Sequence, residues 1–347
     1  MSANRVEISE LGEFGLIDRI HSGTTIRNPS SLTGIGDDAA VIDTGGDECF
    51  LLATDMLVEG IHFDLSYFPL RHVGYKSIVV NVSDIAAMNA RPEQVTVSLA
   101  ISNRFSLEAV DELYAGIQAA CENYKVDLVG GDTTSSLSGL VLSVSAVGRA
   151  KKDKVAYRGG SRPTDIICVT GDLGAAYLGL QVLEREKQVF LSNPDMQPSL
   201  EKYEYIVGRM LRPEARTDII FDLGESGIKP TSMIDISDGL ASELLHLSKM
   251  SGNGVHLFED KIPLDSKTYD TAVEFNLDPI TCALNGGEDF ELLFTISQGD
   301  YEKIKMHPDI HFIGYIHDNK DQNVMITKAE QIVPLRAQGW NHLLRNE

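Results

Sequence analysis

The sequence is poor in cysteine, in tryptophan and in long apolar runs. Its 347 residues include four cysteines, far apart and without a Cys-x-x-Cys pair, and a single tryptophan. Neither a zinc site nor a redox motif is therefore indicated, and we expect the cysteines to be small core residues in a reducing compartment. No stretch approaches about 18 uninterrupted apolar residues, and residues 1–10 lack the apolar core of a signal peptide. We therefore expect a soluble cytoplasmic protein.

Basic residues are also scarce. Lysine and arginine total 30 against 51 aspartates and glutamates, which gives a formal net charge of −21 and a pI near 4.8. A surface of this charge repels nucleic acid and anionic membranes, and it repels nucleotides unless metal ions intervene. We therefore expect neither a nucleic acid nor a membrane as partner.

Two common phosphate-binding motifs are missing. The chain contains no Gly-x-x-x-x-Gly-Lys-Ser/Thr loop and no kinase-type glycine-rich loop with its lysine and catalytic-loop pattern. Residues 170–174 lack the Gly-x-Gly-x-x-Gly spacing of a dinucleotide loop, so a structural turn from strand to helix is the better interpretation. Walker-type NTPases are therefore excluded.

The length of the chain and its 43% hydrophobic content favour two domains. Residues 149–165 are basic and contain two glycines and a proline, so we place the domains at 1–150 and 151–347. The predicted strands and helices alternate irregularly, which indicates an α+β fold with mixed sheets instead of a doubly wound parallel sheet. We also expect a short strand at 127–129 that runs into a loop at 130–133, and a surface excursion at 187–202.

The stretch Gly34-Ile35-Gly36-Asp37-Asp38 places two adjacent carboxylates between a glycine pair and an apolar run. Glycine lets the backbone turn sharply or approach a ligand closely. At about 4 Å and an effective dielectric constant near 20, two like charges repel by about 4 kcal/mol, and a bound cation relieves this repulsion. An ordinary acidic turn before a strand explains the stretch equally well when it is taken alone.

The same combination of acidic residues and glycine recurs at the ends of other predicted elements. The acidic residues concerned, with one from a predicted helix, are Asp37, Asp38, Asp55, Asp84, Asp132, Asp235, Asp238, Glu288 and Asp289. Carboxylates without a matching set of His and Cys suit hard cations, Mg²⁺ above all, which is often shared with substrate phosphates. The glycine pairs at 130–131 and 286–287, and the predicted helix after Ser237, can offer backbone N–H groups to phosphate oxygens.

Several candidate positions also admit an ordinary structural role when they are judged from the residues alone. His62 can be an ordinary loop histidine, Arg158 a solvated linker residue, and Trp340 a core or lid residue. Asp84 can pair with a lysine on its own helix, and Asp289 can cap the strand that follows it. For His62 and Arg158 the structural role is the better interpretation at this level.

Taken together, several stretches in order resemble the thiamine-monophosphate kinase family, within the superfamily of ATP-binding enzymes that includes aminoimidazole ribonucleotide synthetase. Each stretch is weak alone, but their order and spacing make a specific signal over most of the chain. The Glu-Gly-x-His-Phe stretch and the terminal Gly-Trp pair favour this family over its relatives. The stretches lie at 12–14, 34–40, 54–55, 59–63, 81–88, 130–133, 235–239 and 286–291.

The resemblance implies an N-terminal mixed-sheet domain that dimerises, a C-terminal α+β domain, and ATP with several Mg²⁺ ions in the cleft between them. The metal ligands that it implies are Asp38, Asp55, Asp84, Asp132, Asp235 and Asp238. The implied nucleotide contacts are Thr54, Tyr114, Gly131, Asp132, Arg158 and Ser237, and the implied contacts with thiamine monophosphate are His62, Glu288 and Trp340. Asp132 and Arg158 are the implied catalytic residues.

The reaction implied by this resemblance moves the γ-phosphoryl group of ATP onto the phosphate of thiamine monophosphate and yields thiamine diphosphate. The acceptor oxygen is already anionic at neutral pH, so catalysis would consist of positioning and charge neutralisation instead of proton removal. The aspartates would hold the Mg²⁺ ions, and Arg158 would add a fixed positive charge on the transferring group. We expect a homodimer.

Two departures from the family pattern and two rival functions accompany this hypothesis. Thr164 stands where a glycine is usual, and Asn341 and Leu343 replace the usual Asp and Phe. One rival is another ATP-dependent enzyme of the superfamily, although selenophosphate synthetase typically needs a reactive cysteine near its N-terminus and none precedes Cys49. The other rival is a non-catalytic module that binds a nucleotide or a divalent cation.

Overall fold

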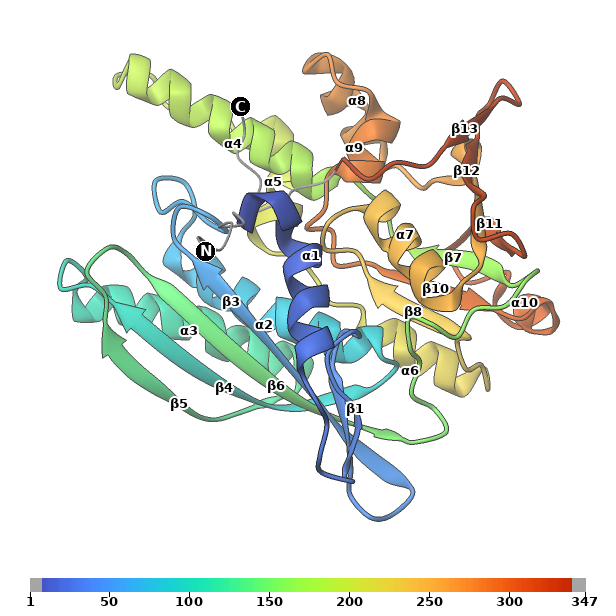
Figure 1. Ribbon diagram of the computed structural model, residues 1–347. Helices are drawn as coiled ribbons and strands as arrows, with labels where there is room; N and C mark the ends of the chain where they lie inside the picture. The colour runs from blue at the N-terminus through green and yellow to red at the C-terminus, as the bar shows by residue number, and fades with distance from the viewer. Residues whose placement is uncertain (1–7, 339–347) are drawn as a thin grey trace, which may run out of the picture.

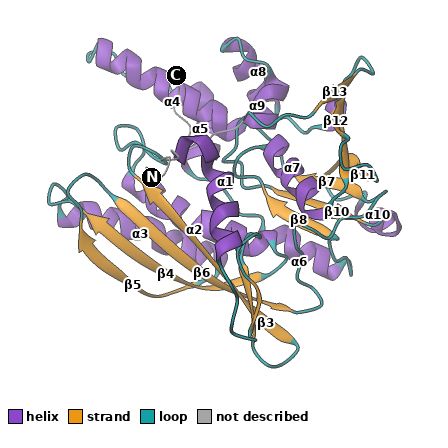
Figure 2. Cartoon of the chain, in the orientation of Figure 1, coloured by secondary structure: helices purple, strands orange, loops and turns teal. Residues whose placement is uncertain are grey.

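The computed structural model describes residues 8–338 and has two mixed sheets with flanking helices, so the predicted α+β class is confirmed (Figure 2). The elements of the first part are α1 (Ile8–Gly23), β1 (Ser31–Thr33), β2 (Ala40–Asp43), β3 (Glu48–Val58), α2 (Leu70–Ala87), β4 (Arg91–Ile101), α3 (Leu107–Tyr124), β5 (Asp127–Ser135) and β6 (Val141–Lys151). Those of the second part are β7 (Ile166–Thr170), α4 (Ala175–Ser192), α5 (Glu204–Leu211), α6 (Thr217–Glu225), β8 (Ser232–Asp235), α7 (Leu240–Ser251), β9 (Gly254–Phe258), α8 (Ser266–Glu274), α9 (Pro279–Asn285), β10 (Leu292–Ile296), α10 (Tyr301–Ile304), β11 (Ile310–His317), β12 (Asn323–Ile326) and β13 (Ile332–Pro334). Short 3₁₀ helices lie at Glu201–Tyr203, Glu259–Lys261 and Gln298–Asp300.

The first sheet has the strand order β1-β2-β3-β6-β4-β5 and is antiparallel except for the β4–β5 pair. The helices α2 and α3 lie against one of its faces (Figure 1). Side chains of β3 alternate accordingly, because Leu51 and Ala53 are buried whereas Leu52 and Met56 are 42% and 56% exposed on the opposite face. The described chain therefore leaves this opposite face, called the open face below, largely accessible to solvent.

A pair of glycines lets α2 and α3 cross at very short range. A Cβ atom added to Gly116 of α3 would lie 1.8 Å from the carbonyl oxygen of Arg71, and one added to Gly74 of α2 would lie 2.0 Å from that of Leu113. Any side chain at either position would therefore force the two helix backbones apart. Serine is a favoured N-cap residue, and Ser106 fixes the N-terminus of α3, since its hydroxyl accepts the backbone N–H of Ala109 at 3.3 Å.

We expect Gly116→Ala to lower the free energy of unfolding by about 1–3 kcal/mol, because overpacking a close helix crossing costs about this much. The measurement is urea unfolding followed by circular dichroism. Gly224→Ala in α6 is the matched control, since nothing lies within 4 Å of the added Cβ and alanine is the better helix former. Equal stabilities of the Gly116→Ala variant and the parent would contradict the close crossing.

The second sheet has the order β13-β12-β9-β11-β7-β10-β8, and its one parallel pair among the described residues is β9–β12. Every residue of β8 and β10 is buried, because apolar side chains cover both faces of these strands. Leu293 of β10 belongs to a hydrophobic cluster with Leu244 of α7, and Phe294, on the other face, belongs to a second cluster with Leu223 of α6. This packing on both faces fixes the positions of β8 and β10, and therefore of the residues at their ends.

The helix α2 is buried on nearly all sides and lies between the two sheets. It contacts β3 and β6 of the first sheet and β8 of the second. Four polar side chains of this helix are nevertheless buried, and they are Lys76, Ser77, Asn81 and Ser83. Buried polar side chains need partners, and those of Lys76 and Ser83 lie in the other half of the chain, at Glu288 and Asp235.

The structure also tests several of the local predictions. The predicted division at 150/151 falls one residue before the end of β6 at Lys151, and the second sheet begins with β7 at Ile166. The two domains themselves stay a prediction. The glycine pair at 130–131 lies inside β5 instead of in a loop, and α4 continues to Ser192 into the expected surface excursion, so both predictions are wrong in these details.

The four cysteines are buried and free, as expected. Within residues 8–338, no helix has the length and apolarity to cross a membrane.

Candidate active site

Three aspartates from distant parts of the chain meet beside α2. Carboxylate oxygens of Asp38, Asp84 and Asp235 all lie within 4.8 Å of one another. Asp38 comes from the loop before β2, Asp84 from the C-terminal part of α2, and Asp235 from the last position of β8. The structure thus unites three of the predicted metal ligands at the boundary between the two sheets, and this group is called the aspartate cluster below.

The electrostatics of the aspartate cluster are unfavourable without a cation. Burial, with repulsion from Asp38 as the next cause, raises the pKa of Asp235 to about 7. Burial raises the pKa of Asp84 well above its ordinary value, and repulsion from Asp55 and Asp235 adds to the effect. Burial also raises the pKa of Asp55, which lies against Asp84. An all-oxygen donor set of this charge fits a hard cation such as Mg²⁺.

Side chains of α2 orient the aspartates. The Ser83 hydroxyl donates to Oδ2 of Asp235 at 2.5 Å, and Oδ1 of Asn81 accepts the backbone N–H of Asp55 at 3.1 Å. Asn81 is itself held by its amide, which donates to the Ser77 carbonyl at 3.1 Å. Ser83 lies in one of the family-like stretches, but nothing in the sequence assigns it a partner 152 residues away.

Arg158 contacts the aspartate cluster, so its interpretation as a solvated linker residue is wrong. Its Nη2 and Nε atoms lie 2.5 Å and 3.2 Å from the two carboxylate oxygens of Asp38. Its backbone N–H donates to Oδ2 of Asp37 at 3.2 Å. The side chains of Asp37 and Asp38 are 6% and 1% exposed, and burial followed by repulsion from Asp38 raises the pKa of Asp37 to about 7. Arg158 therefore supplies positive charge where the aspartates need it.

Ser237 and Asp238 precede α7, next to Asp235. The Asp238 backbone N–H donates to Oε1 of Glu243 at 3.0 Å, and the exposed Ser237 hydroxyl lies 3.5 Å from the same oxygen. Glu243 is buried in the first turn of α7, where it occupies donors at the helix N-terminus. Asp238 is half-buried, and it is not a member of the aspartate cluster.

The described acceptor candidates His62 and Glu288 come from loops of different halves of the chain. His62 is half-buried in the turn after β3, where its Nδ1 accepts the Val58 backbone N–H at 3.0 Å. Glu288 lies in the loop between α9 and β10 and forms an ion pair with Lys76 of α2. Trp340 lies outside the described residues.

Four other predicted contacts belong to the first sheet and its helix. Tyr114 of α3 is half-buried against the first hydrophobic core. The Thr54 hydroxyl donates to the Val144 carbonyl at 3.0 Å. Gly131 and Asp132 lie on β5, exposed at the far edge of the sheet.

Strand register keeps Asp132 away from the aspartate cluster within one chain. The row of paired residues that contains Asp132 runs through Ser98 and Ser143 to Met56, whose side chain is on the open face. Asp55 belongs to the neighbouring row and its carboxylate lies against Asp84 of α2, so the carboxylates of Asp55 and Asp132 lie on opposite faces. Three strand spacings also separate β3 from β5, which amounts to about 14 Å.

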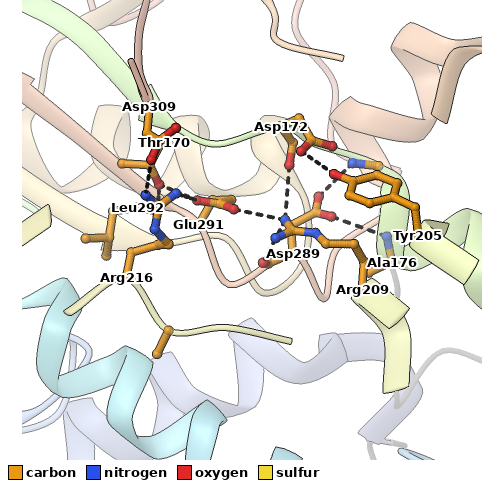
Figure 3. Close-up of polar contacts among 12 residues, drawn as sticks. Thr170, Asp172, Ala176, Tyr205, Arg209, Arg216, Asp289, Glu291, Leu292 and Asp309 are labelled. Carbon is orange, nitrogen blue, oxygen red and sulfur yellow. Dashed lines mark hydrogen bonds and ion pairs between the residues drawn. The ribbon is translucent and has the colours of Figure 1, made fainter. Parts of the chain in front are cut away.

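A second polar network in the C-terminal half was not found from the sequence (Figure 3). Glu291 accepts from Nη2 of Arg209 at 2.9 Å and from Nη1 of Arg216 at 2.8 Å, and the Thr170 hydroxyl donates to it at 2.6 Å. Asp289, a candidate cap for β10, instead accepts the backbone N–H of Gly174 at 2.8 Å, beside α4. The network lines a cavity of about 500 Å³. Ion pairing of this kind fixes the loop that carries Glu288.

We expect Glu291→Gln to lower the free energy of unfolding by about 3 kcal/mol, because the change leaves two largely buried guanidinium groups without their shared carboxylate. The Glu291 side chain is 2% exposed, and those of Arg209 and Arg216 are 16% and 10% exposed. Urea unfolding measures the effect, with Glu302→Gln as control because the Glu302 side chain is 72% exposed. A loss no larger than that of the control would show that the network contributes little to stability.

The class of protein follows from a family model that covers most of the first sheet. The model for the AIR synthase related protein, N-terminal domain, matches residues 36–150, which include the loop of Asp38, the strand of Asp55 and the helix of Asp84. Solved structures of the hydrogenase maturation protein HypE share the fold, with a TM-score of 0.68 at 18% identity for its complex with ATP.

Longer matches define the family more closely. Thiamine-monophosphate kinase of Bacillus subtilis (strain 168) is 34% identical over 337 residues, which cover 94% of this chain and 98% of the relative. The enzyme of that name from Aquifex aeolicus (strain VF5) is 34% identical over 340 residues, which cover 97% and 100%. A solved complex of AaThiL with AMPPCP and TMP matches with a TM-score of 0.84 at 31% identity and covers 98% of this chain and 100% of the other. The chain belongs to the thiamine-monophosphate kinase family.

Proposed function

We propose that the protein transfers the γ-phosphoryl group of ATP to thiamine monophosphate and forms thiamine diphosphate. The observation that carries this proposal is the aspartate cluster beside Arg158, in a chain whose net charge of −21 would otherwise repel both anionic reactants. Full-length similarity to thiamine-monophosphate kinases supports it, as does the match to AaThiL bound to AMPPCP, an ATP analogue, and TMP.

Asp38, Asp84 and Asp235 would hold Mg²⁺ at the boundary between the sheets, and Asp55 adjoins them. When bound, Mg²⁺ would offset the negative charge of the phosphates and help to bring them together. Ser83 and Asn81 keep the carboxylate of Asp235 and the backbone of Asp55 in place for this role. We propose Asp238 as a further ligand because it follows Asp235 by three residues at the start of α7.

Arg158 would stabilise the phosphoryl group during its transfer. Its guanidinium is ion-paired with Asp38 but remains partly exposed, with 22% of the side chain accessible. A guanidinium is planar, is always charged, and suits two oxygens of a phosphate at once. We therefore propose that Arg158 binds the transferring group as charge develops on it, while Ser237 contacts the nucleotide near the N-terminus of α7.

The acceptor would attack directly, without a covalent phosphoenzyme. Its phosphate oxygen is anionic at neutral pH, so the residues of the site need to align it with the γ-phosphoryl group instead of removing a proton. Glu288 and His62 would contact the thiamine part of the acceptor. Trp340, which is not among the described residues, is proposed as a third contact. A carboxylate and an aromatic ring both suit the cationic thiazolium group.

Gly131, Asp132, Tyr114 and Thr54 fit this scheme if two copies of the chain associate through the open face. In one copy, Thr54 and Asp132 lie on that face, and Leu52, Met56 and Val129 are 42%, 56% and 60% exposed. Single monomers rarely leave such a sheet face and its edge strand unpartnered. We therefore propose a homodimer in which β5 of one copy brings Gly131 and Asp132 to the nucleotide site of the other.

The test is ATP turnover by the purified protein with Mg²⁺, with and without thiamine monophosphate. The proposal requires turnover that depends on thiamine monophosphate and yields thiamine diphosphate. ATP turnover that is independent of thiamine monophosphate would favour another enzyme of the superfamily. Nucleotide binding without any turnover would favour a non-catalytic module, and either result would overturn the proposal.

A further inference from the structure

A lysine in the middle of α2 is fully buried. The side chain of Lys76 is 1% exposed and is among the largest fully buried side chains of the described chain. Lysine is almost never buried without a partner, because an ammonium group taken out of water is costly. Its partner is Oε2 of Glu288, and its Nζ atom lies 5.5 Å from the centre of the Phe68 ring. The ion pair therefore joins α2 to a loop of the C-terminal half.

Glu288 is held in an uncommon conformation. Its φ angle is 62°, in the left-handed region, and Gly287 and Phe290 of the same loop have φ angles of 69° and 52°. The Glu288 backbone N–H donates to the Ser237 carbonyl at 2.7 Å, which attaches this loop to the segment that follows Asp235. Non-glycine residues in this region are strained and persist only where the surroundings enforce them, often at ligand sites. The loop conformation and this hydrogen bond therefore fix the position of the Glu288 backbone, from which its side chain extends.

The side chain of Glu288 has one engaged oxygen and an accessible surface. Lys76 contacts Oε2, whereas 34% of the side chain remains exposed. Lys76 precedes Asp84 by eight residues of the same helix, a rise of about 12 Å at 1.5 Å per residue. The helix α2 therefore presents the aspartate cluster near its C-terminal end and the Lys76–Glu288 pair about two turns earlier.

We propose that Lys76 is a positioning residue for the acceptor, which holds the Glu288 carboxylate so that its other oxygen faces the thiazolium ring. The inference rests on the proposed function and deepens it, because thiamine monophosphate carries a phosphate at one end and a cationic ring further along. The phosphate then lies at the aspartate cluster and the cationic ring at Glu288. Lys76 acts through Glu288 and does not itself touch the reacting atoms.

The test compares Lys76→Met and Lys76→Arg in steady-state kinetics of the full-length protein. Lys76→Met is expected to raise KM for thiamine monophosphate about tenfold while KM for ATP changes less than about twofold. Lys76→Arg, which keeps the charge, is expected to restore most of the loss. Lys267→Met on α8 is the control, because Lys267 is exposed. A lower KM for thiamine monophosphate in Lys76→Met would overturn the proposal, since it would mean that Lys76 merely cancels the charge of Glu288.

A double-mutant comparison separates positioning from general stability. If Lys76 acts through Glu288, the Lys76→Met/Glu288→Gln protein has a KM for thiamine monophosphate within about twofold of the worse single variant. Effects that multiply, or equal changes in both KM values, would overturn the proposal. Should Lys76→Met fail to fold, Glu288→Gln carries the test and must change KM for thiamine monophosphate more than KM for ATP, whereas Lys76→Arg must leave both KM values close to those of the parent. Parent protein without turnover that depends on thiamine monophosphate would instead overturn the proposed function itself.

Discussion

Asp235→Asn is expected to lose about 1000-fold in thiamine-monophosphate-dependent turnover and yet to unfold at a higher temperature than the parent in metal-free buffer. Asp235 is 3% exposed and lies against Asp38 and Asp84. The asparagine replaces a charged cation ligand with a neutral one, which weakens cation binding and hence catalysis, and it also removes a repelling charge, which stabilises the metal-free fold. Opposite signs for activity and stability distinguish a ligand from a residue that merely supports the fold.

The pH dependence of stability gives the same prediction an independent readout. Burial raises the pKa of Asp235 from 3.8 to about 7 in the folded protein. The folded state therefore binds the proton more tightly than the unfolded state, so this group favours folding below its ordinary pKa. That contribution is lost as pH rises from about 4 to about 7. The metal-free parent should become less stable over this range, and Asp235→Asn should remove part of the decline.

Thermal unfolding with and without Mg²⁺, together with steady-state turnover, measures these effects. Asp318→Asn is the control, because its side chain is 78% exposed and lies far along the chain on the loop after β11. It should change neither turnover nor stability appreciably. An Asp235→Asn protein that retains turnover, or one that is less stable than the parent without metal, would contradict the role of Asp235.

Arg158→Ala is expected to reduce kcat about 100-fold or more and, at the same time, to strengthen Mg²⁺ binding in the absence of nucleotide. Arg158 engages both oxygens of Asp38, and Asp38 is a member of the aspartate cluster. A cation and the guanidinium therefore compete for the same carboxylate. Removal of Arg158 frees Asp38 for the cation but takes away the fixed charge that we assign to the transferring phosphoryl group.

Calorimetric titration with Mg²⁺ and single-turnover kinetics measure the two effects separately. Arg162→Ala is the control, since Arg162 is an exposed arginine four residues further along the same segment. Weaker Mg²⁺ binding in Arg158→Ala would mean that the arginine organises the cation site instead of competing for it. An unchanged kcat would remove Arg158 from catalysis.

Much of the fold could be predicted because its core helices and strands carry clear patterns. The apolar spacing of residues 72–90 predicts a helix, which is observed as Leu70–Ala87, and Ser106, a favoured N-cap residue type, caps α3. The extent of β5 was missed, because glycines normally interrupt strands whereas Gly131 pairs with Val97 so closely that a Cβ would lie 1.9 Å from the Val97 carbonyl oxygen. No helices were predicted at α5 and α6, although the buried residues Ile206, Val207 and Met210, and then Ile219 and Leu223, recur at helical spacing.

Only those residues of the site whose type and sequence context suggest a function could be predicted. The combination of acidic residues and glycine at element ends singled out Asp38 and Asp235, and the family resemblance implied Asp84 with them; the structure unites all three. Lys76 gave no signal, because a lysine in a helix pattern is normally a solvated residue and burial follows from tertiary packing alone. The arginines of the Glu291 network were missed for the same reason. The roles of Asp132, Gly131 and Tyr114 stay predictions, since they depend on a second copy of the chain.

The central claim is that magnesium supplies the positive charge without which this anionic site could not hold two phosphorylated reactants. The most direct measurement is a crystal structure with AMPPCP and Mn²⁺ in place of Mg²⁺, in which anomalous scattering locates the metal. We predict anomalous peaks at coordination distance from carboxylate oxygens of Asp38, Asp84 and Asp235, with Arg158 turned from Asp38 towards the nucleotide phosphates. Bound nucleotide beside metal-free carboxylates, with Arg158 still paired to Asp38, would contradict the account.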